Sequence, residues 1–328
     1  MREETKPFTA ALTGKAAILA AAFCALTASA VEVRVDFSKD VRPVKPMHAV
    51  GQPPLLGLRD YQLFRYLKEA GVPYARLHDI GSSVPQCRYH MVDIPNVFPD
   101  FDADENDPAN YDFLYTDKML AALIANGVEP WFRLGVSIEN DCKALDDAGY
   151  AHTELSLNEW LPVPSRKTLG TATQAADVCA EMLGLQGTSL DSAMIYDARC
   201  GLGIFSPLFN PYDYSPHKAY YAFKAFNELY KRGTEVESSS SDRWVTWVAA
   251  ARGEKDGAVV IAHTGDKEVP LVLELCGRNK LRPSPRGGGV KCKVRECRIT
   301  DETRTNEIVP PPTMLPPHSF LVVTVDCD

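Results

Sequence analysis

The chain lacks a run of basic residues, a C-x-x-C pair and any cysteine–histidine spacing typical of a zinc site. Its 328 residues include 35 Lys or Arg and 43 Asp or Glu, for a net charge of -8. An acidic chain without a basic cluster does not suit nucleic acid or an anionic membrane surface. We therefore expect no nucleic-acid partner, no metal and no cofactor.

The N-terminus has the pattern of a secretory signal. Basic residues precede an apolar stretch from Ala16 to Leu26, and Ala28-Ser29-Ala30 has the small residues of a cleavage site. The apolar run is shorter than the ~20 residues that a membrane span needs, and no second run of that length follows. We predict that residues 1–30 are a signal peptide and that the mature chain is secreted or periplasmic, with no membrane span.

Two segments repeat one design, in which a helix is followed by Gly-Val, a proline and a strand. In the first, residues 58–70 have helical spacing and Tyr74 to His78 is the strand; in the second, these are residues 115–126 and Trp131 to Leu134. Helices that alternate with strands predict a parallel sheet. Further strands are expected at 48–51 and 192–197, and further helices at 172–185 and 218–231.

From Arg243 onward the sequence predicts short strands separated by Gly, Asp and Pro, which is typical of an antiparallel β sandwich. We interpret Ser238 to Ser241 as a linker before this region. The alternating strand Val31 to Phe37 lies outside the barrel pattern and is a candidate to pair with it. The long segment 79–110 is expected to form a wall of the active site.

The stretch AHTELSLNEW, Ala151 to Trp160, predicts a short strand that delivers Glu159 at its carboxyl end. In barrels of alternating strands and helices, the loops after the strands build the active face. Glu159 is therefore a candidate catalytic carboxylate. From this segment alone, a solvated loop carboxylate is an equal alternative.

Several motifs in the same order resemble glycoside hydrolase family 39, the retaining β-xylosidases and α-iduronidase-like enzymes. They are RLHDI (76–80), FPDFDAD (98–104), DPANYDF (107–113), FRLG (132–135), LNEW (157–160) and YYAFKAFNELY (220–230). The resemblance implies an α/β fold, a (β/α)8-type barrel with a β sandwich attached, and a carbohydrate substrate. It places Glu159 at the nucleophile's position after the seventh strand.

The acid/base residue that the family carries in an Asn-Glu-Pro motif after the fourth strand is missing from this sequence. Only residues 136–150 separate the segments that resemble the third and seventh strands, so about five of the eight barrel strands are recognisable. We expect an incomplete barrel over residues 31–234, truncated near 136–150, and a sandwich over 242–328. Glu139 could substitute as the acid, although a solvated carboxylate at the junction is the simpler interpretation.

The remaining candidates for sugar contacts stand in or after predicted strands: His48, His78, Asp79, Asn158, Trp160 and Asp197. The resemblance implies that His78 contacts the sugar at the subsite of cleavage. Each residue also has a structural alternative. A strand-end His often serves as a hydrogen-bond donor, a Trp packs in a core, and Asp197 can form an ordinary salt bridge with Arg199.

Overall fold

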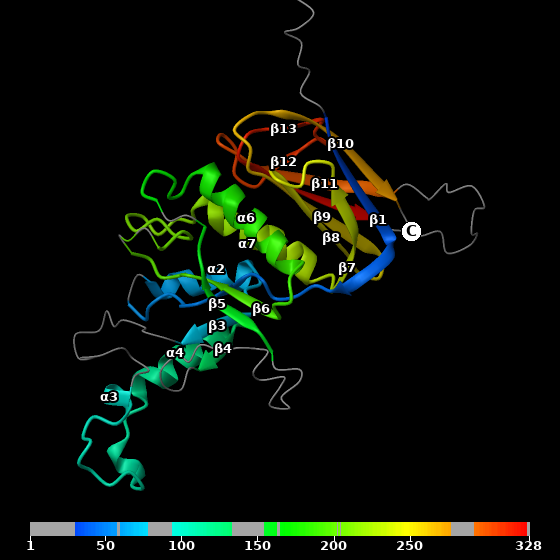
Figure 1. Cartoon of the computed structure of the whole chain (residues 1–328). Helices are drawn as coiled ribbons and strands as arrows, with labels where there is room; N and C mark the ends of the chain where they lie inside the picture. Colours follow the sequence, from blue (N-terminus) through cyan, green and yellow to red (C-terminus); the bar gives the residue numbers. More distant parts are fainter. Residues whose placement is uncertain are drawn as a thin grey trace, which may run out of the picture.

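The computed structural model describes residues 30–57, 60–77, 94–132, 154–162, 165–201, 203, 205–276 and 292–326. They form a small parallel sheet and a large curled sheet, with two long helices packed between them (Figure 1). The predicted signal peptide falls almost wholly outside the described residues. The described part of the chain contains no helix long and apolar enough to span a membrane.

The parallel sheet predicted from the repeated helix–strand units is confirmed. Its strands are β2 (Ala49–Val50), β3 (Tyr74–Leu77), β4 (Glu129–Phe132), β5 (Ser156–Trp160) and β6 (Ser192–Ile195). They lie in the order β4-β3-β2-β6-β5, and every neighbouring pair is parallel. The first strand of this sheet in the sequence, β2, thus pairs with the last, β6, and β4 and β5 lie at the two edges of the sheet as described.

The helices follow the predicted ranges closely, apart from the first. They are η1 (Asp60–Leu63), α2 (Phe64–Glu69), α3 (Ile94–Val97), η2 (Pro108–Asn110), α4 (Leu114–Ala125), α6 (Ala172–Gln186) and α7 (Lys218–Tyr230). The single helix predicted over 58–70 is divided, because its first described turn is a 3-10 helix. Gly71 and Gly127 follow α2 and α4 with φ of 62° and 72°, a conformation that glycine adopts without steric cost.

The large sheet has nine strands in the order β12-β11-β14-β9-β8-β7-β1-β10-β13. These are β1 (Val31–Pro43), β7 (Thr234–Ser240), β8 (Thr246–Arg252), β9 (Asp256–His263), β10 (Val269–Cys276), β11 (Lys293–Thr300), β12 (Glu307–Val309), β13 (Met314–Leu315) and β14 (Ser319–Asp326). Only the β1–β10 pair is parallel. The C-terminal strands therefore belong to one curled sheet that also takes in β1 and β7.

The predicted linker at Ser238 to Ser241 is wrong. Ser238, Ser239 and Ser240 end β7 and pair with Val35, Arg34 and Val33 of β1, respectively. A run of serines has little strand propensity of its own, so its extended conformation is imposed by the partner strand.

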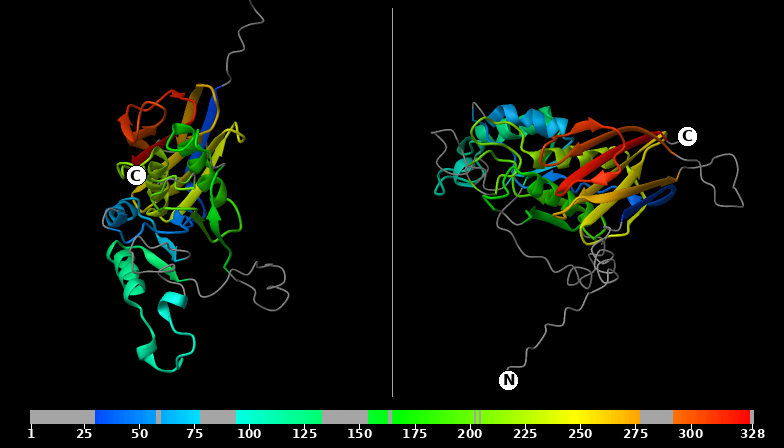
Figure 2. Two further views of the ribbon diagram at one scale, coloured as in Figure 1. Left: turned by 90° about the vertical axis from the view of Figure 1, so that its left-hand side faces the viewer. Right: turned by 90° about the horizontal axis from the view of Figure 1, so that it is seen from above.

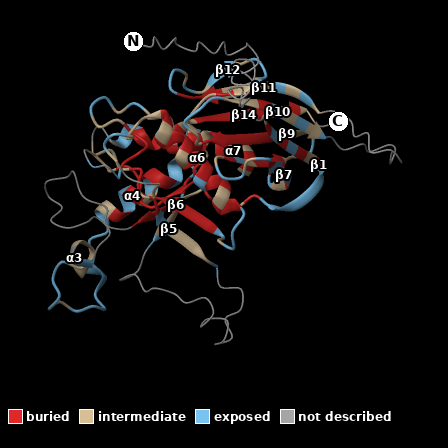
Figure 3. Ribbon diagram, turned by 45° about the horizontal axis from the view of Figure 1, so that its top comes forward, coloured by how far each residue is buried: buried red, intermediate tan, exposed pale blue. Residues whose placement is uncertain are grey.

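The nine-stranded sheet has a buried layer on each face. On one face, alternate residues of β1, such as Val33 and Val35, pack with side chains of β9, β11 and β14 in a core internal to the curled sheet. On the other face, Val260 and Val322 join α6, α7 and the parallel sheet in the main core. Figure 3 shows the buried side of α6 and α7 enclosed between the sheets. The curled sheet therefore braces the helices that back the small sheet.

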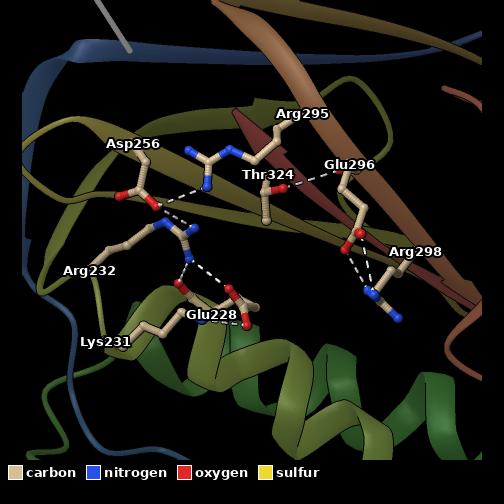
Figure 4. Close-up of polar contacts among 8 residues, drawn as sticks. All are labelled: Glu228, Lys231, Arg232, Asp256, Arg295, Glu296, Arg298 and Thr324. Atoms are coloured by element: carbon tan, nitrogen blue, oxygen red, sulfur yellow. Dashed lines mark hydrogen bonds and ion pairs between the residues drawn. The ribbon is translucent and has the colours of Figure 1, made fainter. Parts of the chain in front are cut away.

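Ion pairs hold the end of α7 to the curled sheet (Figure 4). The buried Arg232 guanidinium, just after α7, lies 2.8 Å from Glu228 Oε2 and 2.8 Å from Asp256 Oδ2 at the start of β9. Nη1 of Arg295 lies 3.9 Å from the same Asp256 oxygen. Because Arg232 is nearly enclosed, its contacts are shielded from water and fix the helix on the sheet.

The described part of the long segment 79–110 does not lie over the sheets. Figures 1 and 2 show α3 and η2 in an arm that projects from the body beyond α4. The arm is held by its own aromatic side chains, with the Phe98 and Tyr111 ring centroids 4.9 Å apart and Tyr111 stacked on Phe113. The predicted wall of an active site is therefore not formed by residues 94–110.

Candidate active site

Glu159 lies near the carboxyl end of β5, where the pairing with β6 is irregular. Leu157 pairs with Ala193 and Trp160 with Ile195, so Asn158 and Glu159 together face a single residue of β6. Such a bulge inserts one residue and redirects the side chains beside it. The Glu159 side chain remains 42% exposed, although Trp160 beside it is buried. The carboxylate is thus available at the edge of the core.

The carboxylate of Glu159 forms an ion pair with Arg76 of β3, through Oε1 and Nη2. The Arg76 side chain is only 5% exposed, and its Nε lies 3.5 Å from the carbonyl oxygen of Gly51. A buried guanidinium is costly unless it is paired, so the contact both anchors Arg76 and orients the carboxylate. Sequence reasoning did not select Arg76 as a site residue, although an arginine between the apolar residues Ala75 and Leu77 of a short strand signals a charged group with a buried partner.

Gly51, directly after β2, allows β5 and β6 to approach. A Cβ at this position would lie 2.9 Å from the carbonyl oxygen of Asn158 and 3.2 Å from that of Ile195. Its amide donates to the same Ile195 oxygen at 2.8 Å. Any side chain here would push apart the backbone that carries Glu159, so the arrangement requires glycine. Asn158 itself has an exposed side chain.

Asp197, two residues after β6, is buried in a cluster of polar groups. Its Oδ2 accepts from Arg199 Nε at 2.8 Å, and its Oδ1 accepts from Ser206 Oγ at 3.2 Å and from the Arg199 amide at 3.1 Å. Burial raises the pKa of this carboxyl, and Arg199 opposes the rise. The salt bridge with Arg199, one of the two alternatives for Asp197, is formed, and the sugar-contacting role stays a prediction. These contacts make Asp197 a support for the loop beyond β6.

Two buried side chains, one next to Glu159 in the chain and one next to Gly51, have polar atoms without a hydrogen-bond partner among the described residues. They are Nε1 of Trp160 and Oε1 of Gln52. Gln52 follows Gly51, and its carbonyl oxygen accepts from the Ala198 amide at 2.9 Å. Buried donors and acceptors are normally satisfied, so these two atoms are open to a hydrogen-bond partner from outside the described residues, as is Nδ1 of the buried His48. Trp160 was predicted from the sequence, whereas Gln52 was not.

His48 is placed away from this group. It lies just before β2, is fully buried, and its Nε2 is 3.0 Å from the carbonyl oxygen of Gly71. Its ring packs against Phe226 and Tyr230 of α7, with centroids 5.3 and 5.0 Å away. Burial lowers the pKa of this imidazole to about 4. These contacts give His48 a place in the core between β2 and α7.

Three predicted residues, His78, Asp79 and Glu139, lie outside the described residues. Within the described ranges, no group of three or more His, Cys, Asp or Glu side chains could hold a metal ion. The candidate site therefore consists of Glu159 paired with Arg76, with Trp160 next to Glu159 in the chain and Gly51 against the backbone of Asn158, at the carboxyl ends of β2, β3 and β5.

No family model matches the sequence, and no curated protein matches it. Solved structures do. The chain is similar to a glucosidase from Croceicoccus marinus, with a TM-score of 0.64 and 12% identity over 91% of this chain and 99% of that one. It is also similar to a family 39 β-xylosidase from Caulobacter crescentus, with a TM-score of 0.57 and 12% identity over 90% of this chain and 99% of that one. A family 30 endoxylanase from Clostridium papyrosolvens has a TM-score of 0.54 and 11% identity, over 90% of this chain and 100% of that one. The chain shares the fold of these glycoside hydrolases.

Proposed function

We propose that this chain is a retaining glycoside hydrolase of the family 39 type, which acts on β-xylosides or related plant polysaccharide ends with Glu159 as the nucleophile. The observation that carries the proposal is the ion pair between Glu159 and the buried Arg76 at the carboxyl ends of parallel strands. The shared fold with glycosidases supports it. We further propose that the parallel sheet is an incomplete (β/α)8 barrel, and that the curled sheet corresponds to the attached sandwich domain.

The proposed chemistry begins at the Glu159 carboxylate. One carboxylate oxygen attacks the anomeric carbon, the bond from that carbon to the leaving oxygen breaks, and the leaving group departs with the electron pair. In the second step water attacks the same carbon and releases the carboxylate, while a base accepts the proton of the water. The ion pair with Arg76 orients the Glu159 side chain at the carboxyl ends of the strands.

The leaving oxygen of an ordinary glycoside needs a proton, which a second carboxyl group about 5 to 5.5 Å away supplies in retaining enzymes. The Asn-Glu-Pro motif that would supply this group is missing from the sequence. Glu139 is the weak substitute that the sequence offers. A second candidate function follows, in which the chain is a catalytically inactive remnant that binds carbohydrate.

The two functions are separated by a substrate whose leaving group needs no proton. We would incubate the purified chain with a 2-fluoro xyloside of a very acidic phenol and measure its intact mass. A live nucleophile gives a stoichiometric adduct, which peptide mapping assigns to Glu159. A folded chain that forms no adduct would favour the non-catalytic function.

Two variants control this measurement. Glu159→Gln removes the nucleophile while keeping the size of the side chain, and no adduct should form. Glu154→Gln changes another exposed carboxylate just before β5, and the adduct should form as in the unmodified chain. Circular dichroism of each variant establishes that it is folded.

We also propose that the chain acts outside the cytoplasm, as its predicted signal peptide implies. N-terminal sequencing of the exported protein would test this, since cleavage after Ala30 would leave Val31 at the start. In the structure Val31 is the first residue of β1, so the predicted cleavage leaves that strand whole.

A further inference from the structure

A groove separate from Glu159 runs along α6, where the helix meets the loop before β8 and the start of that strand. Its volume is about 590 Å3, within the roughly 300–1,000 Å3 of typical small-molecule sites. It is lined by Pro162, Asp177, Glu181, Gly184, Trp244 and Trp247, among others. Asp177 and Leu185, both on its wall, are eight residues apart on α6, so the groove extends along about 12 Å of helix.

Two of the four tryptophans of the chain line this groove. Trp244 is 90% exposed, and Trp247 is 38% exposed. Trp247 lies against α6 at Gly184, where an added Cβ would come within 3.2 Å of its ring. The missing side chain at Gly184 thus lets the indole lie close to the helix. An indole left in water is a flat apolar surface with a polar edge, which suits a ligand with both apolar and hydroxyl faces.

The described residues that line the groove offer two carboxylates, two hydroxyls and two indole N–H groups, and no Lys or Arg is among them. Asp177 and Glu181 stand one helical turn apart on α6, and Thr188 and Thr264 complete the lining. Neither carboxylate has a hydrogen bond to any described residue; burial raises the pKa of Asp177, and only the charge of His318 opposes this. A half-buried carboxylate without a protein donor can accept a hydrogen bond from a ligand hydroxyl.

We infer that this groove is a second carbohydrate site, which binds a neutral chain of pyranose units rather than a charged one. The pyranose C–H faces stack on Trp244 and Trp247, and sugar hydroxyls donate to Asp177 and Glu181. Along α6 the two carboxylates disfavour acidic sugars and nucleic acid, whereas the neighbouring groove beyond Trp244 is lined by both Asp242 and Arg243. Because Trp244 also lines a neighbouring groove of about 490 Å3, the surface suits an oligosaccharide better than a monosaccharide.

The inference goes beyond the proposed function, because it does not require Glu159 to be active. Pro162 lines the groove only three residues after Glu159, so a chain bound along α6 would lead toward the loop that follows β5. The groove would then retain a polysaccharide whose end is presented to the candidate active site.

The four tryptophans provide the test. The full chain labelled with 5-fluorotryptophan gives one 19F resonance for each, assigned with Trp244→Phe, Trp247→Phe and Trp160→Phe. Titration with xylohexaose is expected to shift the Trp244 and Trp247 resonances together. Trp244→Ala, at a position almost fully in water, should fold normally and weaken this binding about tenfold, which corresponds to 1.4 kcal/mol. Asp177→Asn should weaken it by a smaller factor.

Phe101→Ala is the matched control, because it removes an exposed aromatic ring from the projecting arm and should leave binding unchanged. Binding that moves only the Trp160 resonance would overturn the groove site while keeping the proposed function. Shifts at Trp244 without an adduct at Glu159 would support the groove and count against the nucleophile. Equal shifts with oligolysine would overturn the assignment to a neutral sugar.

Discussion

The buried His48 makes the stability of the protein depend on pH in a defined direction. Its imidazole lies between Gly71 and the aromatic rings of α7, and burial lowers its pKa from 6.5 to about 4. Between these two values the unfolded chain binds a proton that the folded chain does not. The free energy of unfolding therefore falls as the pH is lowered through this window and is fully available above about pH 6.5.

The magnitude follows from the same two values. At about 1.4 kcal/mol per pH unit, the loss attributable to His48 is about 2 kcal/mol at pH 5 and roughly 3 kcal/mol once the folded form is protonated. Other groups also titrate in this range. The contribution of His48 is isolated by comparison with His48→Gln, which can still donate to the Gly71 carbonyl but does not ionise.

The assay is urea unfolding of both proteins at pH 7 and pH 5, followed by circular dichroism. We expect the unmodified chain to lose about 2 kcal/mol more than the variant between the two pH values. Equal losses would refute the reasoning, because they would mean that His48 is protonated as easily when folded as when unfolded. Such a result would return His48 to the solvent-accessible, sugar-contacting role that the sequence suggested.

Three further variants test the site and its support. Arg76→Met should slow adduct formation at Glu159 at least about tenfold. Arg76→Lys should restore only part of the rate, because an ammonium lacks the planar geometry of guanidinium. An unchanged rate with Arg76→Met would contradict the orienting role of Arg76. Gly51→Ala should cost roughly 1–3 kcal/mol of unfolding free energy, because the added methyl group meets two backbone carbonyls. The control Gly203→Ala, where the nearest atom to the added methyl group is 3.9 Å away, should cost little. Equal costs in urea unfolding would argue against the close approach of β2 and β5. Arg232→Met should lower the free energy of unfolding by about 2–4 kcal/mol, because it leaves two carboxylates without their buried partner. At the exposed Lys231, Lys231→Met should lower it by less than about 1 kcal/mol. Thermal unfolding that ranks the two variants in reverse would contradict the bracing role of the α7 ion pairs.

Local sequence signals were sufficient for α4, α6 and α7 and for the existence of the parallel sheet, but not for the short helices α3 and η2 within segment 79–110. The Gly71 and Gly127 stops, each followed by a valine and then a proline, mark where α2 and α4 must end, because these features act within a few residues. The position of Glu159 at the end of β5 follows from alternation and the prolines after it. These predictions needed no knowledge of distant segments.

The features that local signals missed all depend on residues far away in the chain. Ser238 to Ser240 form a strand only because β1, some 200 residues earlier, offers a partner. The bulge at Asn158 and Glu159 arises from the register with β6, and Arg76 acquires its role from a carboxylate 83 residues later. Local composition does not predict such pairings, because they depend on which strands become neighbours when the sheets form.

The position of β1 between β7 and β10 in the curled sheet also sets an order of events during synthesis. Val31 pairs with Leu271, 240 residues later, so the first strand of the body cannot complete its ladder until β10 has left the ribosome. At 5–20 residues per second this is a wait of about 12 to 48 s. During that time the apolar side of β1, which includes Val33 and Val35, lacks the core against which it packs in the folded protein. A stop codon before β10 would therefore also remove the partner strand of β1, so the loss of C-terminal residues would destabilise the N-terminal strand as well. A protease cut before β10 would weaken the same pairing.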